Sequence, residues 1–376
     1  MRTAEAIAEE WRAQTGGRVD VVDYFTQFVH PLFDAVTRFS YVQSVRRAPV
    51  MYGLFYKLTG DVRPDSLVQR TINGMGMQRL ERYLREERPD VVCCVHCTPA
   101  GTMSDLHAAG RTSVPCVTVI TDYVNHSQWT HPHVDRYCVP NSLVRDGLIA
   151  RGILPERIVV SGLPINLKFQ RPVDRVAVLA RLGLVPGVPV VLVMAGAYAM
   201  LGGVLDVVRV LAELPHPIQV VVVCGYDRRL AARARARAAG ARHPVRVFGY
   251  VDDVEELMTV TDLLITKAGG ITVSEALAKH LPMLIYRPIP GQEEGNTRFL
   301  VSHGAALAPR TPAQLRTMLE DLLVHPDRLA AMRQAAAALA RPDAVRIVTA
   351  HLASLARGSA GAPPPPPALT ASSPAP

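Results

Sequence analysis

The sequence predicts an α/β protein of two domains, each built on a parallel, doubly wound sheet. The chain has 376 residues, a length typical of two domains. Short apolar, β-branched runs alternate with helical patterns along most of the chain, which is the order that βαβ units require. Hydrophobic residues make up 49% of the chain, enough to fill two cores.

The first predicted domain covers residues 1–163. It opens with a helix over residues 3–14, where apolar residues recur at helical spacing. Strands are predicted over residues 18–24, 90–96, 116–122, 136–140 and 157–162, with helical segments between most of them. Gly162-Leu163-Pro164 marks the boundary between the halves.

The second predicted domain covers residues 164–340. Its strands are predicted over residues 188–196, 218–225, 245–251, 262–266 and 283–286, and an Ala- and Arg-rich helix over residues 228–239. Residues 182–205 carry no charge and are numerous enough to span a bilayer. Prolines and glycines interrupt them, however, so they favour a buried strand, a glycine turn and a helix.

The C-terminal part is predicted to be helical over residues 326–355, with an interruption at Pro342. Residues 341–357 would form a final helix that could pack back on the first domain. Residues 358–376 contain a proline run from Pro363 to Pro367 and are predicted to be disordered, because they cannot bury a core.

The net charge and the cysteines indicate which partners and which cellular compartment to expect. A net charge of +8 favours an anionic partner. No nucleic-acid signature occurs, so we expect an anionic membrane surface and no nucleic acid, with an ordinary solvated basic surface as the alternative. The six cysteines lie mostly in apolar runs, and the N-terminus lacks the apolar core of a signal peptide. Buried thiols in a reducing, cytoplasmic compartment are therefore expected.

The most informative segment is ITKAGGITVSEALAKHLPMLIYRPIPGQEEGN, residues 265–296. A strand stops at Lys267, and a helix opens after Gly269 and Gly270 near Thr272. Glycines allow close backbone approach, and a helix start favours an anion, usually phosphate. Glu275, one turn into the helix, is suited to accept hydrogen bonds from ribose hydroxyls. The later loop offers Gln292 and Glu293 to sugar hydroxyls; the alternative is an ordinary β-Gly-Gly-α turn.

TKAGGITVSEAL and PGQEEGN resemble the diacylglycerol glycosyltransferase and monogalactosyldiacylglycerol synthase family, which is related to the peptidoglycan N-acetylglucosaminyltransferase. The resemblance implies a GT-B fold, in which two Rossmann-like domains face each other across a cleft and the second binds a UDP-sugar. It also implies donor contacts at Gly196, Phe248, Tyr250, Val251 and Asn296, with packing in a strand core as the alternative for Phe248 and Tyr250. The chain departs from the family pattern at Tyr198, Ala199, Asn166, Leu167 and Ala268.

The first half carries a second motif, Thr121-Asp122-Tyr123 followed by His126-x-x-Trp129-x-His131, which also resembles this family. Asp122 ends a predicted strand that should point into the cleft. Inverting transfer needs a base for the acceptor hydroxyl, and Asp122 and His126 are the candidates. The alternative for Asp122 is a turn cap. No carboxylate set accompanies the histidines, so no metal or other cofactor is expected.

Two further expectations concern the N-terminal third. Residues 25–56 are aromatic and basic, and the resemblance places the corresponding region against the membrane and the lipid; a packed helix pair is the alternative. Family members open with a strand and a Gly-His loop, and Met1-Arg2-Thr3-Ala4 stands just after that loop. The first domain is therefore expected to be N-terminally incomplete, through an upstream start or a damaged enzyme.

The function implied is inverting, metal-independent transfer of a hexose, glucose or galactose, from a UDP-sugar to the 3-hydroxyl of diacylglycerol. The enzyme would be cytoplasmic and peripheral on the inner face of the cell membrane. One alternative is N-acetylglucosaminyl transfer to a lipid-linked peptidoglycan precursor. The other is a non-catalytic UDP-sugar binding protein.

Overall fold

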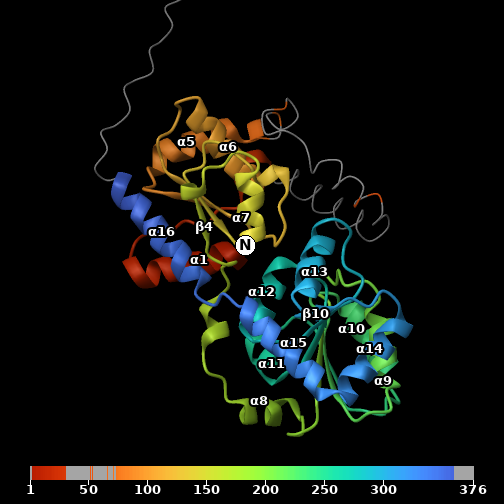
Figure 1. Cartoon of the computed structure of the whole chain (residues 1–376). Helices are drawn as coiled ribbons and strands as arrows, with labels where there is room; N and C mark the ends of the chain where they lie inside the picture. Colours follow the sequence, from red (N-terminus) through yellow and green to blue (C-terminus); the bar gives the residue numbers. More distant parts are fainter. Residues whose placement is uncertain are drawn as a thin grey trace, which may run out of the picture.

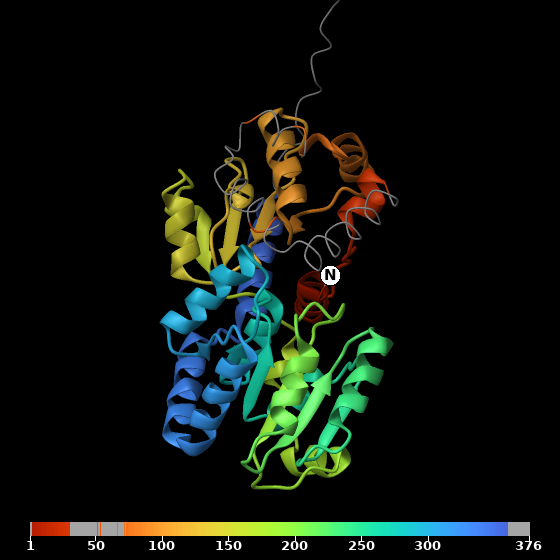
Figure 2. The same cartoon turned by 90° about the vertical axis from the view of Figure 1, so that its right-hand side faces the viewer.

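The computed structural model describes residues 2–30 and 73–359, together with Met51, Gly53, Ser66 and Thr71. Within these residues the chain forms two parallel sheets, one in each half (Figure 1). The strand order is β1-β2-β3-β4 in the first sheet and β10-β9-β8-β5-β6-β7 in the second. Figure 2 shows the halves stacked one above the other, so the sites between them must combine residues from both.

The first sheet contains β1 (Val92–Cys94), β2 (Cys116–Val119), β3 (Arg136–Val139) and β4 (Ile158–Val160). Its helices are α1 (Arg2–Thr15), α5 (Met77–Glu87), α6 (Cys97–Ala108) and α7 (Ser142–Ile149), with short helical turns η1 (Phe25–Val29), η2 (Ser127–Trp129) and η3 (Pro155–Arg157). The predicted N-terminal helix and the four predicted strands from residue 90 onward are confirmed.

The strand predicted over residues 18–24 is wrong. Residues 18–23 pair with no strand in the part of the chain that the structure describes, and Tyr24 leads into η1. Their three valines suit a strand, but a strand forms only where a neighbour completes its backbone hydrogen bonds. Arg18 instead pairs with Asp20 and Glu87 at the surface.

The second sheet contains β5 (Val190–Met194), β6 (Gln219–Val223), β7 (Val245–Phe248), β8 (Leu263–Thr266), β9 (Met283–Ile285) and β10 (Ala306–Leu307). Its helices are α8 (Arg175–Leu182), α9 (Val204–Ala212), α10 (Arg228–Ala238), α11 (Val254–Val260), α12 (Gly270–Ala278), α13 (Gln292–Ser302), α14 (Pro312–Val324) and α15 (Pro326–Leu339), preceded by η4 (Leu167–Gln170). All five predicted strands are confirmed; β10 was not predicted, because two residues are too few to give a pattern.

Strand β5 explains the uncharged stretch between residues 182 and 205. Every residue of the strand is buried, and successive side chains enter opposite cores. Leu192 packs in the cluster on one face of the sheet, and Val191 and Val193 pack in the cluster on the other. A strand covered by helices on both faces reads as a continuous apolar run. Within the described residues, no helix has the length and apolar character needed to cross a membrane.

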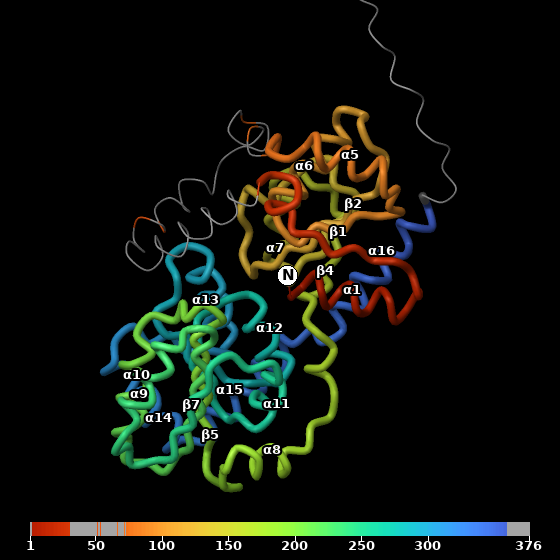
Figure 3. Tube along the Cα trace, turned by 180° about the vertical axis from the view of Figure 1, so that it is seen from behind, coloured from red at the N-terminus to blue at the C-terminus, as the bar shows by residue number. Residues whose placement is uncertain are grey.

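Helix α16 (Ala344–Ser359) returns to the first half after the break at Pro342 and lies against α1 (Figure 3). Val345, Val348 and Leu352 share a buried cluster with Ile7 and Val117. The helix reaches Ser359, so the predicted disordered tail begins no earlier than residue 360, and the rest of that prediction lies outside the described residues. Most of the aromatic and basic segment of residues 25–56 also lies outside them.

Candidate active site between the two domains

Asp122 lies where the loop after β2 meets the second domain. The carboxylate is buried, and its two oxygens accept hydrogen bonds from different halves of the molecule. Trp129 Nε1 donates to Oδ2 at 3.3 Å, and Gln292 Nε2, at the start of α13, donates to Oδ1. Burial raises the pKa of Asp122 to about 6, although Trp129 and His96 act in the opposite direction. A carboxylate with such a pKa is suited to accept a proton near neutral pH.

His126 is buried a few residues further along the same loop and caps η2. Its Nδ1 accepts a hydrogen bond from the Gln128 backbone N–H at 3.3 Å. His131, the last residue of the motif, is also buried, and burial lowers its pKa to about 4. These contacts hold the loop in shape, and the role of His126 as a base stays a prediction. The described residues contain no cluster of three or more metal-binding side chains.

The start of α12 gathers the residues predicted to bind phosphate. Gly269 precedes the helix and offers no side chain that could cap its first N–H groups. Lys267 Nζ would lie 3.1 Å from a Cβ on Gly269, and Lys267 Cε would lie 3.4 Å from a Cβ on Gly196. Gly196 has a φ of +79°, a conformation that favours glycine. One cationic side chain thus lies between two glycine loops beside a helix N-terminus, an arrangement that attracts an anion.

Gly270 has a different neighbour from the one that the sequence suggests. A Cβ at this position would lie 2.2 Å from the backbone oxygen of Thr121 in the first domain. The close approach that requires glycine here is therefore made by the other domain. Thr272 lies half-buried in the first turn of the same helix.

The loop before α13 holds the residues predicted to bind the sugar. Glu293 is buried and already engaged, because Lys267 donates to its Oε1 and the Ile289 N–H donates to Oε2 at 3.0 Å. Asn296 is fully buried: its Oδ1 accepts from the Tyr123 N–H at 3.0 Å, and its Nδ2 donates to the Ala268 oxygen at 2.9 Å. Sugar binding by Glu293 and Asn296 stays a prediction, and here both join segments of the protein.

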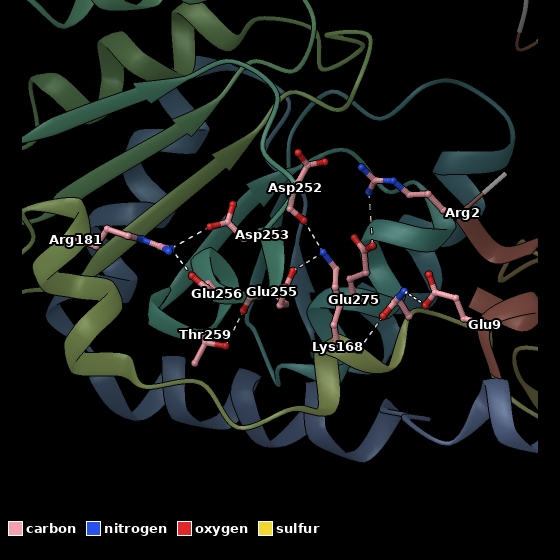
Figure 4. A network of polar contacts seen from close by, with 11 residues as sticks. Arg2, Glu9, Lys168, Arg181, Asp252, Asp253, Glu255, Glu256, Thr259 and Glu275 are labelled. Atoms are coloured by element: carbon pink, nitrogen blue, oxygen red, sulfur yellow. Dashed lines mark hydrogen bonds and ion pairs between the residues drawn. The ribbon is translucent and has the colours of Figure 1, made fainter. Parts of the chain in front are cut away.

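Glu275 lines a cavity of about 330 Å³ between the domains, and Figure 4 shows its carboxylate facing Arg2. Its side chain is 4% exposed, and Oε2 has no hydrogen-bond partner among the described residues. Arg2 of α1 approaches Oε1 at 3.7 Å. Burial raises the pKa of Glu275 to about 7, while Arg2 and Lys168 lower it and Glu255 raises it. A buried carboxylate oxygen without a donor is suited to a ligand that brings hydroxyl groups.

Of the three residues predicted to flank the nucleobase, only Tyr250 lines this cavity. Phe248 and Val251 are partly buried against the core of the second domain, which agrees with a packing role for their side chains. Tyr250 lines the cavity and is 39% exposed. Its ring stacks on Tyr226 with centroids 4.3 Å apart and planes 7° apart. The pair presents a flat aromatic surface at the ends of β6 and β7.

Three residues near the site were not singled out from the sequence. Arg2 reaches the cavity only because α1 packs between the halves. His96 caps α6 and lies beside Trp129, with ring centroids 6.5 Å apart. Tyr123 enters the core of the second domain. Tyr123 could have been predicted from the sequence, because it belongs to the Thr121-Asp122-Tyr123 motif. The positions of Arg2 and His96 depend on tertiary packing and could not.

Comparison with known proteins gives consistent results for both halves. Residues 1–165 match the family model for monogalactosyldiacylglycerol (MGDG) synthase, and residues 190–347 match the glycosyltransferase family 28 C-terminal domain. A processive diacylglycerol beta-glucosyltransferase from Bacillus cereus is 31% identical over 354 residues, which cover 94% of this chain and 90% of that protein. A protein of the same name from Bacillus cytotoxicus is 32% identical over 325 residues, which cover 86% of this chain and 82% of that protein.

Solved structures extend the comparison to the fold. MurG from Acinetobacter baumannii matches with a TM-score of 0.58 and 19% identity, covering 75% of this chain and 78% of that one. Staphylococcus aureus MnaA with UDP matches with a TM-score of 0.59 and 16% identity, covering 75% and 80%. Two Rossmann-like domains facing each other in this way define a GT-B enzyme, as predicted. Within that class, the chain belongs to the diacylglycerol glycosyltransferase family and is a hexosyltransferase.

Proposed function

We propose that this enzyme transfers a hexose from a UDP-sugar to the 3-hydroxyl of diacylglycerol, with inversion and without a metal ion. The observation that carries the proposal is the meeting of Asp122, from the first domain, with Gln292 and the α12 start, from the second. This contact would put the proposed proton acceptor near the proposed diphosphate site. Glucose is the first donor to test, because the relatives above are named as glucosyltransferases.

In the proposed reaction, the acceptor hydroxyl attacks the anomeric carbon of the sugar and Asp122 takes its proton. The bond between that carbon and the diphosphate oxygen breaks, and UDP leaves. The N–H groups at the start of α12 and the ammonium group of Lys267 stabilise the negative charge that develops on the leaving group. Attack from the face opposite UDP inverts the anomeric configuration, so an α-linked donor gives a β-glycoside.

The nucleoside is proposed to occupy the cavity beside α12. Glu275 would accept hydrogen bonds from the ribose hydroxyls, and Arg2 would favour the ionised form of that carboxylate. Backbone groups of Tyr250 and Val251 would contact uracil. The S. aureus structure with UDP shares this fold, which supports a UDP-sugar as the donor.

The acceptor is proposed to arrive from an anionic membrane surface on the cytoplasmic side. The net charge of +8 supports such a contact. Diacylglycerol is insoluble, so an enzyme that uses it must reach into a lipid surface.

The test is a transfer assay with labelled UDP-glucose or UDP-galactose and vesicles that contain diacylglycerol, with EDTA present. The proposal expects a labelled β-glycolipid that depends on diacylglycerol. UDP binding without product would support a non-catalytic binder. Product only from UDP-N-acetylglucosamine and a polyprenyl-linked precursor would support the peptidoglycan alternative. Loss of product with EDTA would contradict metal independence.

A further inference from the structure

The loop that carries Asp122 is docked between two helices of the second domain. Residues 121–124 leave β2 of the first sheet and contact α12 and α13. Gln292, at the start of α13, donates to Asp122, and the two residues are separated by 170 positions in sequence. The contacts of the next residue, Tyr123, are more extensive.

Tyr123 contacts its surroundings through its ring, its backbone N–H and its backbone oxygen. Its ring is 5% exposed, belongs to the core cluster of the second domain, and lies 5.2 Å from the ring of Phe299. Its backbone N–H donates to Asn296 Oδ1 at 3.0 Å, and its backbone oxygen accepts from Asn141 Nδ2 at 3.1 Å. A residue of the first domain therefore forms part of the core of the second.

The hydroxyl of Tyr123 has a defined direction of hydrogen bonding. It lies 2.8 Å from Ser274 Oγ, and Ser274 itself donates to the Gly270 oxygen at 2.9 Å. Because the serine proton is used within α12, Tyr123 is the donor between the two hydroxyls. Burial raises the pKa of Tyr123 to about 12, so the hydroxyl keeps its proton at neutral pH.

Two glycines give the loop room to dock. A Cβ on Gly270 would lie 2.2 Å from the Thr121 oxygen, and a Cβ on Gly295 would lie 2.7 Å from two methyl carbons of Val124. The loop therefore makes close contacts with the second domain on both sides of Asp122. Such a fit fixes the distance from the Asp122 carboxylate to the start of α12, where the donor diphosphate is proposed to bind.

We propose that Tyr123 is a positioning residue that fastens the Asp122 loop to the donor-binding domain through Ser274 and Asn296. The inference rests on the proposed function, since it concerns the base of that reaction. A displacement of about 1 Å at a catalytic group can lower a rate by about 100-fold. Tyr123 thereby couples domain closure to the placement of the base, because the carboxylate is in position only when the ring is seated in the second domain.

The experiment compares Tyr123→Phe and Ser274→Ala, alone and combined, with the wild-type full-length chain. Tyr123→Phe keeps the ring and removes only the hydroxyl. We expect kcat for transfer to fall about 10- to 100-fold, with the Kd for UDP changed less than about twofold. Because one hydrogen bond is shared, the double variant should be no slower than the slower single variant.

A matched control is Tyr24→Phe, which removes a buried hydroxyl that lies 2.8 Å from Thr102 Oγ1 within the first domain. It should lower Tm about as much as Tyr123→Phe does while leaving kcat unchanged. Equal loss of kcat in both variants, or wild-type kcat in Tyr123→Phe, would overturn the inference. If the wild-type chain transfers no hexose to diacylglycerol, the proposed function fails and the inference with it. Wild-type transfer together with normal kcat in Tyr123→Phe would refute the inference alone.

Discussion

The donor side and the acceptor side of this site are built in different ways. On the donor side, the candidates for binding phosphate and ribose lie within one β-loop-α unit, from Lys267 to Glu275, and next to a second loop at Gly196. On the acceptor side, Asp122 and Tyr123 depend on partners that are distant in sequence, Gln292 and Asn296. A site made by local backbone geometry can be read from a motif, whereas a site made by domain docking needs the structure.

Replacing the proposed base gives the largest expected effect. Asp122→Asn keeps the shape of the side chain but cannot accept a proton from the acceptor. We expect kcat to fall about 100- to 10,000-fold, while UDP binding stays within about twofold of wild type. Labelled-lipid assays and UDP titration measure the two quantities. Asp146→Asn, at an exposed position of α7, serves as the control. Normal turnover in Asp122→Asn would remove it as the base and direct attention to His126.

Much of the fold followed from sequence because parallel sheets give strong local signals. Four of the five predicted strands of the second domain are wholly buried, and their apolar runs are typical of a sheet that is covered on both faces. Residues 18–24 show the limit: they are rich in valine, but no described strand pairs with them. The motifs likewise located Glu275, but not Arg2, which lies more than two hundred residues away and meets it only across the domain interface.

The second prediction separates the two glycines that the motif treats alike. Gly270→Ala puts a methyl group against the Thr121 oxygen, so the domains must move apart. We expect transfer to fall about 100-fold and small-angle scattering to show a larger radius of gyration. Gly269→Ala meets only the flexible end of Lys267 and should change kcat and UDP affinity by a few-fold at most. Equal losses of UDP affinity in both variants would instead assign both glycines to phosphate binding.

The third prediction concerns the unpaired carboxylate oxygen of Glu275. Glu275→Gln keeps the volume and removes the charge that the ribose hydroxyls would meet. Because a hydrogen bond to a charged group contributes about 1.5–3 kcal/mol, we expect UDP affinity to fall about 10- to 100-fold. Calorimetric titration with UDP and with 2′-deoxy-UDP makes the test specific. The deoxy ligand lacks one ribose hydroxyl, so its affinity should differ less between the wild type and the variant than the affinity of UDP does. Unchanged UDP affinity would exclude the ribose role.

The same variant is expected to be at least as stable as the wild type. The pKa of Glu275 is raised to about 7 by burial, so above that pH the folded protein holds an ionised carboxylate that prefers water. A neutral amide avoids this penalty. A Tm at pH 8 that is equal to or higher than that of the wild type would agree with this account, and a clear decrease would mean that the ion pair with Arg2 outweighs the cost of burial.

The smallest expected effect is the pH dependence, and it separates the two sides of the site within one protein. Both carboxylates act in the ionised form, which is lost as the pH falls through the pKa. UDP affinity should therefore weaken below about pH 7 through Glu275, and kcat at saturating donor should fall below about pH 6 through Asp122. Well below its midpoint kcat should drop about tenfold per pH unit, whereas UDP affinity should level off about 10- to 100-fold lower, at the value of Glu275→Gln.

Variants assign the two midpoints to their residues. Glu275→Gln should flatten the pH dependence of UDP affinity and leave the midpoint in kcat near pH 6. Asp122→Asn should flatten kcat and leave the midpoint in UDP affinity near pH 7. A kcat that rises on acidification would mean that Asp122 works in its protonated form, as a donor to the leaving group or the acceptor, and the direction of proton transfer proposed for this site would be reversed.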